Sequence, residues 1–447
     1  MTLRTAYRAL AGAVLLITLE MMHCTMSVGA DQPDRTGGVF QNIPTLAAYE
    51  WNFFADSGDA YLIGNMDIHK WMPSASCFGD GVNCGKPHQH LLSEPESRGR
   101  RVFTIGKERY LAVSIYYDRP SSSYRTNSLI YKWMAGSACF GDGRACGVAL
   151  QKIASVGARD VEIIEIAGKR YLAVANYFDG SSYQGSLGLM EWLPESECFG
   201  AQAACNNLLQ VVPVTAAFAL DSISVGADTY LAVAIYFDGN SFQQNSLIYR
   251  WMPAQSCFGD GSACGAALQK LSTAAAVDVR HFRLDGGIYV GFAGFYNGSS
   301  FAETPSYVYK WLDTRSCFGD GTSCGAPFQV LPTGNLRGLE PFAIGPQAFL
   351  AGSNYYDGTS YSTGSKIYKW MTAASCFGSG ERCGVPFQQI PTIGAAGWKS
   401  FVIGGNSYLV VANDFDGSRY DLNSSIYVWM PGENCFGDGL RCAGSHP

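Results

Sequence analysis

Residues 251–269, WMPAQSCFGDGSACGAALQ, carry a tryptophan, two cysteines and a glutamine at fixed distances from one another. The arrangement recurs along the chain, with a cysteine six and thirteen residues after each tryptophan. The seven tryptophans are Trp71, Trp133, Trp192, Trp251, Trp311, Trp370 and Trp429. A period of about 60 residues through most of the chain predicts one repeat domain rather than several unrelated domains.

Each unit contains four short segments with the patterns of β-strands. In the third unit, residues 160–166 (DVEIIEI) largely alternate between polar and apolar positions, and residues 171–177 (YLAVANY) form an apolar run typical of a buried strand. Residues 187–192 and 208–212 give two further strands, separated by turn-forming residues. Four strands in each of the units predict an all-β fold, a seven-bladed β-propeller of four-stranded blades.

A glutamine follows the second cysteine by five residues in six units. These are Gln89, Gln151, Gln210, Gln269, Gln329 and Gln388. The last unit lacks it, but residues 40–45 (FQNIPT) match residues 387–392 (FQQIPT) and supply Gln41. We therefore expect the N-terminal strand to complete the last blade and close the ring. We interpret the tryptophans as packing anchors between blades, and the glutamines as side chains that bond a neighbouring backbone.

Fourteen of the fifteen cysteines belong to the repeat, two in each unit. An even number at regular spacing in a secreted chain predicts disulfides, one per blade. The predicted pairs are Cys77/Cys84, Cys139/Cys146, Cys198/Cys205, Cys257/Cys264, Cys317/Cys324, Cys376/Cys383 and Cys435/Cys442. Zinc is disfavoured because paired zinc cysteines usually have about two residues between them, whereas the two cysteines of each unit are seven positions apart. The six histidines are also scattered along the chain. We expect neither a metal nor a cofactor.

Residues 1–30 have the features of a secretory signal peptide. Arg4 and Arg8 precede an apolar run at residues 9–19, and small residues at 28–30 precede Asp31. The run is shorter than the roughly 20 residues of a membrane span, so an uncleaved anchor is the less favoured alternative. We expect residues 1–30 to be removed, residues 31–36 to be a short leader and residues 37–447 to form the propeller.

The net charge and the apolar runs of the chain limit the kinds of partner that we expect. Without residues 1–30 the chain has 29 basic and 36 acidic residues, a net charge of −7, which argues against nucleic acid or an anionic membrane as a partner. No apolar run after the first thirty residues approaches 18 residues, so we expect no membrane span. The expected localisation is secreted, in the extracellular space, and the propeller is expected to be monomeric.

The third unit reads GARDVEIIEI at residues 157–166, then YLAVANY, a polar loop and a Ser-x-Ile-Tyr-x-Trp pattern that most other units show in full. This combination resembles the EAR (epitempin) repeat family over roughly residues 37–443. The resemblance implies an extracellular seven-bladed propeller that acts as a protein-interaction module, without catalytic residues. The CFGDG disulfide loop departs from the usual repeat, so the partners of other members are not carried over.

Long polar loops join the second and third strands of units two to seven. Tyrosine, serine, asparagine and glycine in such loops are typical of adaptable recognition surfaces, although Asp-Gly-Ser-Ser is also a turn former. The candidate binding residues are Asp118, Tyr124, Asp179, Tyr183, Asp238, Phe242, Asn297, Phe301, Asp357, Tyr361, Asp416 and Tyr420. Asn297 and Asn423 stand in Asn-x-Ser sequences and would be glycosylation sites in a eukaryotic host.

We expect the disulfide loops on the opposite face. Their aspartates, interpreted as a solvated acidic rim rather than a cation site, are Asp80, Asp142, Asp260, Asp320 and Asp438. The first unit is irregular, because residues 61–71 lack the long polar loop. Such asymmetry is one way for a ring of similar blades to acquire a distinctive site, and drift in a terminal unit is the alternative.

The leading functional hypothesis is a secreted, non-enzymatic propeller that binds an extracellular protein. The alternative is a carbohydrate-binding, lectin-like propeller, since tyrosine, tryptophan, asparagine and aspartate suit sugar binding. An enzyme is the least favoured hypothesis because no nucleophile and base or pair of acids stands out from the repeat. Its candidates, Asp160, Asp278 and Glu340, lie near the first strands and are expected to line the central channel.

Overall fold

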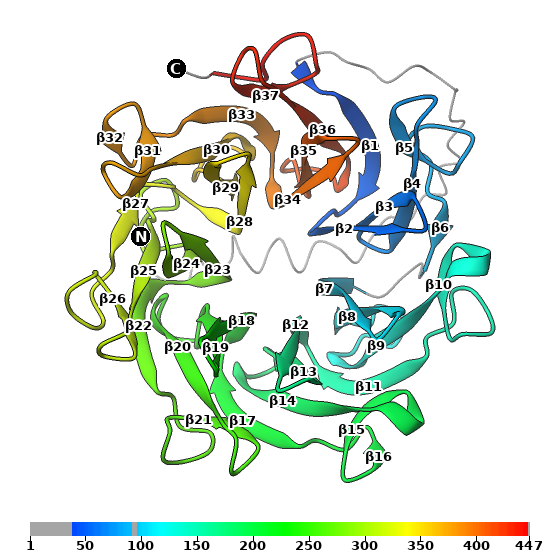
Figure 1. The fold of residues 1–447 in the computed structure, drawn as a ribbon, viewed down its shortest axis with the longest axis vertical. Coiled ribbons are helices and arrows are strands. Elements are labelled where there is room, and N and C mark those ends of the chain that lie inside the picture. Colours follow the sequence, from blue (N-terminus) through cyan, green and yellow to red (C-terminus); the bar gives the residue numbers. More distant parts are fainter. Residues whose placement is uncertain (1–37, 92–95, 446–447) are drawn as a thin grey trace. The chain divides into compact units, whose positions relative to one another are not determined.

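The computed structural model describes residues 38–91 and 96–445, which fold into seven antiparallel β-sheets. The predicted signal peptide and leader lie outside the described residues. The sheets follow one another around a ring, with the first strand of each sheet facing the ring centre (Figure 1). The described residues contain no α-helix, and none of their helical turns is long and apolar enough to cross a membrane. The all-β, seven-bladed prediction is confirmed.

Blade 3 shows the plan of a blade. The four predicted strands are present, with bounds that differ from the prediction by one to three residues at most ends, and each pairs antiparallel with the next. They are β12 (Ala158–Ile166), β13 (Lys169–Asn176), β14 (Gln184–Leu193) and β17 (Gln210–Thr215). The interior of β13 is buried, as expected for an apolar run covered on both faces.

The disulfide loop adds a strand that the sequence did not predict. In blade 3, β15 (Cys198–Ala201) pairs with the end of β14, while β17 pairs with its beginning. Two separate segments therefore share the outer edge of each blade. The corresponding strands elsewhere are β5 (Cys77–Gly79), β10 (Cys139–Gly141), β21 (Cys257–Gly259), β26 (Cys317–Gly319), β31 (Cys376–Ser379) and β37 (Cys435–Gly437), with short additions β16 (Ala204–Cys205) and β32 (Arg382–Cys383).

All seven predicted disulfides are present, and their Cα atoms lie 5.7–5.8 Å apart. The pairs are Cys77–Cys84, Cys139–Cys146, Cys198–Cys205, Cys257–Cys264, Cys317–Cys324, Cys376–Cys383 and Cys435–Cys442. The first cysteine of each pair is buried, whereas the second is partly or fully exposed.

The second cysteine of each pair is not the plain loop residue that the sequence suggested. It forms an antiparallel bridge to the glycine two positions after the first cysteine, as Cys84 does with Gly79 and Cys205 with Gly200. The same bridge is formed by Cys146, Cys264, Cys324, Cys383 and Cys442. Each disulfide therefore closes a small hairpin at the edge of its blade, and the cysteines have a structural role.

The other blades repeat the plan of blade 3. Their first strands are β2 (Trp51–Asp56), β7 (Glu96–Ile105), β18 (Ala217–Val225), β23 (Ala276–Leu284), β28 (Leu336–Ile344) and β34 (Ala395–Ile403). The second strands are β3 (Asp59–Gly64), β8 (Glu108–Tyr117), β19 (Asp228–Ile235), β24 (Gly287–Gly294), β29 (Gln347–Asn354) and β35 (Asn406–Asn413). The third strands are β4 (Asp67–Met72), β9 (Arg125–Met134), β20 (Gln243–Met252), β25 (Ser306–Leu312), β30 (Ser362–Met371) and β36 (Asp421–Met430). The outer strands are β6 (Gln89–His90), β11 (Gln151–Val156), β22 (Gln269–Ala274), β27 (Gln329–Leu331) and β33 (Gln388–Ile393).

The ring closes as predicted. The N-terminal strand β1 (Gln41–Leu46) pairs with β36 in the last blade, from Gln41 opposite Ile426 to Leu46 opposite Asp421. Blade 7 thus joins residues nearly 400 positions apart in the sequence, and its outer edge is completed like those of the other blades.

The repeated tryptophans pack between blades, which confirms their interpretation as anchors. Each contacts an aromatic ring on the second strand of the preceding blade, with centroids 4.8–6.0 Å apart. The pairs are Trp71–Tyr408, Trp133–Tyr61, Trp192–Tyr110, Trp251–Tyr171, Trp311–Tyr230, Trp370–Tyr289 and Trp429–Phe349. Such tilted and edge-on contacts stabilise each interface beyond the area that they bury.

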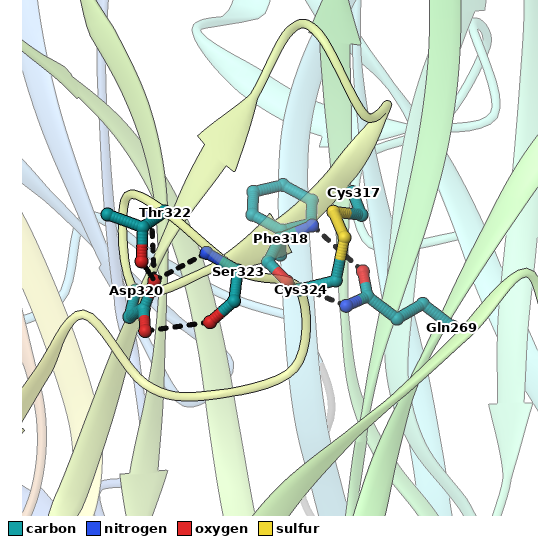
Figure 2. Close-up of a disulfide and its surroundings, with 7 residues drawn as sticks. All are labelled: Gln269, Cys317, Phe318, Asp320, Thr322, Ser323 and Cys324. Atoms are coloured by element: carbon teal, nitrogen blue, oxygen red, sulfur yellow. Dashed lines mark hydrogen bonds between the residues drawn. A yellow bond between two sulfur atoms is a disulfide. The ribbon is translucent and has the colours of Figure 1, made fainter.

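The seven glutamines link the blades by hydrogen bonds. Each Nε2 donates to the carbonyl of a phenylalanine in the next blade, and each Oε1 accepts from the N–H of the same residue, at 2.7–2.9 Å. Figure 2 shows Gln269 of blade 4 on Phe318 of blade 5. Phe318 follows Cys317, which is bonded to Cys324, so the disulfide braces the strand that receives the glutamine.

Candidate functional site: the loop face and the central channel

One face of the ring carries the loops between the second and third strands; we call it the loop face. In blade 3, the start of β12 pairs with the end of β13, Ala158 opposite Asn176, so the first strand begins at this face. The disulfide loop follows the other end of β14, where Leu193 pairs with Cys198. The two kinds of loop therefore lie at opposite ends of the third strand, as expected.

The loop aspartates form turns. Asp179 Oδ1 accepts hydrogen bonds from the backbone N–H groups of Ser181 at 2.8 Å and Ser182 at 2.6 Å. Because these donors favour the ionised form, they hold the pKa of Asp179 below its ordinary value. Asp238, Asn297, Asp357 and Asp416 accept the same pair of backbone bonds, whereas Asp118 accepts from the Ser121 hydroxyl. These side chains hold the loops in shape.

The loop aromatic residues form a ladder around the face. Each packs 4.3–4.8 Å from a ring of its own blade. These pairs are Tyr124–Tyr117, Tyr183–Phe178, Phe242–Phe237, Phe301–Tyr296, Tyr361–Tyr356 and Tyr420–Phe415. The first five also contact the following blade, at 4.8–5.4 Å. The predicted aromatic residues therefore form one continuous array over blades 2 to 7, in which each ring is partly buried against its neighbours.

The array is interrupted at blade 1. There β3 and β4 are joined by a two-residue turn at Asn65 and Met66 instead of a long loop. Asn65 Nδ2 donates to the Ala47 carbonyl at 2.9 Å, and its Oδ1 accepts from Tyr49 N–H at 3.2 Å. Tyr49 is thereby fixed at the entry of the chain into blade 1.

The aspartates of the disulfide loops are also turn residues. Asp320 Oδ1 accepts from the backbone N–H groups of Thr322 and Ser323, both at 2.7 Å (Figure 2). These bonds lower the pKa of Asp320. Asp80, Asp142, Asp260 and Asp438 accept equivalent bonds. Among the residues that the structure describes, no group of three or more His, Cys, Asp or Glu side chains is arranged to hold a metal ion.

The two predicted glycosylation sites differ in their surroundings. Asn297 Oδ1 already accepts bonds from Ser299 and Ser300 in its turn. Asn423 is exposed in β36, opposite Pro44 of β1. Glycosylation at both sites stays a prediction.

A β-bulge near the start of each first strand shapes the channel in blades 3 to 7. In blade 3 the register shifts between Ala158 and Asp160, so that Arg159 is the extra residue. The equivalent residues are Phe218, Val277, Arg337 and Ala396. All five line a cavity in the channel. Bulges commonly redirect a side chain in this way.

Three arginines surround Tyr49 at the loop-face end of the channel. The guanidinium groups of Arg98, Arg159 and Arg337 lie 4.9, 5.6 and 5.4 Å from the Tyr49 ring centre. Arg337 also forms an ion pair with Asp414 at 3.3 Å. We call these five residues the channel mouth. They come from four different blades and from the entry into blade 1.

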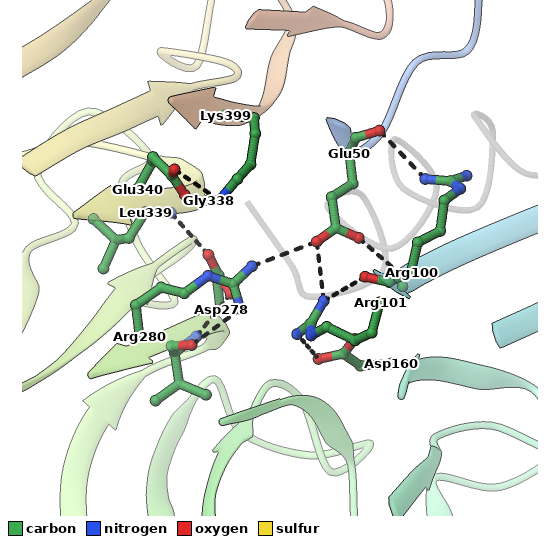
Figure 3. Close-up of polar contacts among 12 residues, drawn as sticks. Glu50, Arg100, Arg101, Asp160, Asp278, Arg280, Gly338, Leu339, Glu340 and Lys399 are labelled. Atoms are coloured by element: carbon green, nitrogen blue, oxygen red, sulfur yellow. Dashed lines mark hydrogen bonds and ion pairs between the residues drawn. The ribbon is translucent and has the colours of Figure 1, made fainter. Parts of the chain in front are cut away.

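An ion network crosses the channel deeper inside (Figure 3). Glu50 contacts Arg101 of blade 2 at 3.1 Å and Arg280 of blade 5 at 3.6 Å. Arg101 also contacts Asp160 at 3.3 Å, and Arg280 contacts Asp278 at 3.3 Å. Blades from opposite sides of the ring are therefore joined through charged side chains.

The three acids considered for catalysis each bond the next blade. Asp160 accepts from Leu220 N–H at 2.9 Å, Asp278 from Leu339 N–H at 2.8 Å, and Glu340 from Ser400 N–H at 2.9 Å. All three residues are buried, with 5–6% of their surface exposed. Burial raises the pKa of Asp160 to about 7 and that of Asp278 to about 6, against the opposing effect of the arginines. Their contacts assign them to blade assembly.

The cavity between the channel mouth and the ion network has a volume of about 50 Å³. Tyr49, Arg159 and Arg337 line it, together with the acids Asp160 and Asp278. This volume corresponds to roughly three to five water positions, so the cavity accommodates a group of only a few heavy atoms.

Sequence reasoning missed the channel mouth. Arg98, Arg159 and Arg337 are not repeated at equivalent positions of all units, and the bulge that exposes Arg159 to the channel has no local sequence signature. The available signal was that arginine replaces phenylalanine, valine or alanine at one position of the repeat.

Comparisons with known proteins support the repeat assignment. The EPTP domain family model matches residues 148–182, 326–371 and 385–430. A mouse thrombospondin-type laminin G domain and EAR repeat-containing protein is 29% identical over 354 residues, covering 77% of this chain and 45% of the relative. The human protein of the same description is 27% identical, covering 71% and 43%. The chain thus spans less than half the length of these curated relatives.

A solved structure supports the fold alone. A putative 6-phosphogluconolactonase from Bacteroides fragilis has a TM-score of 0.54 and 10% identity, and the alignment covers 93% of this chain and 98% of that one. Such low identity carries no activity over to this protein. The family model and the curated relatives confirm the resemblance to the EAR repeat family, and the chain is a seven-bladed β-propeller whose repeats are similar to those of these relatives.

Proposed function

We propose that this chain is a secreted, monomeric, non-enzymatic propeller that binds an extracellular protein through its loop face. The main support is the construction of that face. The ladder of packed rings gives the loops a firm base, while their tips expose small polar residues such as Ser181, Asn240, Thr359 and Ser418. Polar, adaptable tips on a rigid aromatic base suit a protein-binding surface.

The interruption at blade 1 breaks the symmetry of the loop face. A perfect ring of seven equal loops would offer equivalent positions to any partner, whereas the two-residue turn at Asn65 leaves one sector different from the other six. A partner that contacts this sector is held in one orientation. The singular residues of the channel mouth lie at the same end of the blades.

The geometry favours a protein over a glycan as the ligand. Sugar binding by stacking needs an open aromatic face, but the ring of Tyr183 packs against Phe178 of its own blade and Phe237 of the next. The other loop rings of blades 2 to 6 are covered in the same way. The exposed loop tips remain for hydrogen bonding to a protein surface.

Seven disulfides support an oxidising compartment. The relatives' description as laminin G and EAR repeat-containing proteins accords with an extracellular role. These points support the proposed localisation.

Affinity capture from extracellular proteins, followed by mass spectrometry, tests the proposal with two matched double variants. The loop-face variant carries Ser181→Arg and Thr359→Arg. The control carries Ser262→Arg and Thr322→Arg in the disulfide loops, where the residues are equally exposed and form the same bonds to an aspartate. We expect wild type and control to capture the same protein, and the loop-face variant to lose at least tenfold in affinity. Equal loss in both variants, or capture of glycans alone, would contradict the proposal.

A further inference from the structure

We infer that the channel mouth binds one carboxylate group, carried by an acidic side chain of the protein partner. The inference rests on the proposed function, because it names the chemistry by which the partner engages the loop face. Three guanidinium groups gather around one tyrosine ring at the loop-face end of the channel.

The charges at the channel mouth do not balance. Arg98 forms an ion pair with Glu96, and Arg337 forms one with Asp414 at 3.3 Å. Arg159 forms an ion pair with none of the carboxylates among residues 38–91 and 96–445. Arg159 is therefore the arginine of the channel mouth without a direct ion pair, while Glu50, Asp160 and Asp278 line the deeper wall of the same cavity. Burial, and to a smaller degree repulsion by Arg159, lowers the pKa of Arg98 to about 10.

The hydrogen-bonding capacity of Arg159 is also largely unused. A guanidinium has five N–H donors, and Arg159 uses one of them, from Nη2 to the Tyr49 hydroxyl at 3.2 Å. Its Nε is buried and has no partner among the described residues. Aromatic rings hold the group from its sides, with Phe218 at 4.0 Å and Tyr116 at 4.8 Å. The side chain is thus fixed in place with donors to spare.

The cavity sets the size of the ligand group. Both Arg159 and Arg337 line its wall, and its volume of about 50 Å³ suits a group of a few heavy atoms. A carboxylate is small, planar and negative, and it matches the donor fork of a guanidinium. The surrounding aromatic rings lower the local polarity, which strengthens the attraction between opposite charges.

The route to the cavity favours a side chain of a partner. Tyr116, Tyr177, Tyr236, Phe295 and Tyr355 surround the loop-face end of the channel, one from each of blades 2 to 6. A glutamate or aspartate side chain on a protein bound at the loop face fits such an entrance, because its apolar stem can lie against these rings while its carboxylate reaches the arginines.

The test uses the full chain and glutarate, with the neutral glutaramide as the matched compound. Thermal unfolding is followed against the concentration of each at constant ionic strength, because a ligand of the folded state raises Tm. The variants are Arg159→Gln, Arg159→Lys and, as a control, Arg144→Gln in an exposed disulfide loop. Circular dichroism and the Tm without glutarate establish that each variant is folded.

We expect glutarate to raise the Tm saturably in wild type and Arg144→Gln, and glutaramide to have no effect. Arg159→Gln should weaken the apparent affinity at least tenfold, and Arg159→Lys should lie between, because lysine keeps the charge but loses the fork. If Arg159→Gln is unfolded, the apparent affinity of Arg159→Lys for glutarate is compared with that of wild type instead. An equal shift in the Arg159 variants, or no shift in folded wild type, would overturn the inference.

Capture of the partner by the same variants separates the two proposals. Capture that weakens with Arg159→Gln and is competed by glutarate supports the inference. Undiminished capture by Arg159→Gln overturns the inference and leaves the proposed function standing. Glutarate binding that depends on Arg159, without capture of any extracellular protein by the folded wild type, overturns the protein partner and with it the proposed function.

Discussion

At the periphery of the ring, seven equivalent glutamines bond seven equivalent phenylalanines, whereas along the axis the residue at the bulge position varies among blades 3 to 7. Arginine at Arg159 and Arg337 takes the place of Phe218, Val277 or Ala396. Every blade must meet its neighbours in the same way, so packing demands repetition. A site that holds one ligand needs groups that are not repeated in every blade, and the axis supplies them.

The largest expected effect comes from opening the ring. Deletion of residues 39–45 removes most of β1, including Gln41 and its bonds to Phe78, and exposes the edge of β36. We expect loss of the folded monomer, seen as oligomers in size-exclusion chromatography and as a large fall in Tm. A monomer with the wild-type Tm would contradict the closure of the ring by β1.

Breaking one glutamine link should have a smaller effect. Gln388→Leu leaves the Phe436 N–H and carbonyl without partners inside a buried interface, where Gln388 is 1% exposed. We expect a loss of about 2–4 kcal/mol in the free energy of unfolding, measured by urea denaturation. The control, Gln255→Leu at an exposed position, should change it by less than about 0.5 kcal/mol. An equal loss of free energy of unfolding in both variants would contradict the role of the glutamines in stabilising the contacts between blades.

Removing one disulfide tests how strongly the outer strand depends on it. Replacing Cys317 and Cys324 by serine opens an eight-residue ring, and loop entropy gives a loss of roughly 2–3 kcal/mol. Binding at the loop face should be unchanged, because the loop lies at the opposite end of β25. A variant that stays folded yet loses the partner would move function to the disulfide face.

The smallest predicted effect is a difference in the pH dependence of stability between an aspartate at the axis, Asp278, and one at the periphery, Asp320. Burial raises the pKa of Asp278 to about 6, so the folded state keeps its proton where the unfolded state has lost it, and its contribution to stability falls as pH rises from about 4 to 6. Backbone bonds lower the pKa of Asp320, so its contribution is present above about pH 4 and is lost as pH falls.

Urea unfolding of Asp278→Asn and Asp320→Asn between pH 3 and 7 measures both. Relative to wild type, Asp278→Asn should gain stability as pH rises, and Asp320→Asn should lose it. Slopes of the same sign would show that the two aspartates are not in such different surroundings.

The sequence predicted those features that repetition makes visible. The period, the tryptophans, the cysteines and the glutamines recur seven times, and the match of residues 40–45 to residues 387–392 predicted the closing strand correctly. The short strand at Cys198–Ala201 was missed because three or four residues rich in glycine and cysteine resemble a loop until their pairing with β14 is known.

The candidate site was predicted less well, for a physical reason. The loop residues were found from composition, but composition does not show that the ring of Tyr183 is covered by its neighbours. The channel mouth depends on bulges and on contacts among blades far apart in sequence, so Tyr49, Arg98 and Arg159 meet only in the folded ring.

Amide hydrogen exchange of the propeller, alone and with its captured partner, tests the central claim most directly. We expect the partner to slow exchange in the loop-face segments 179–185 and 357–364 and around Tyr49 and Arg159, while exchange in the disulfide loops, such as residues 257–264, is unchanged. Protection confined to the disulfide loops, with the loop face exchanging as in the free protein, would contradict it.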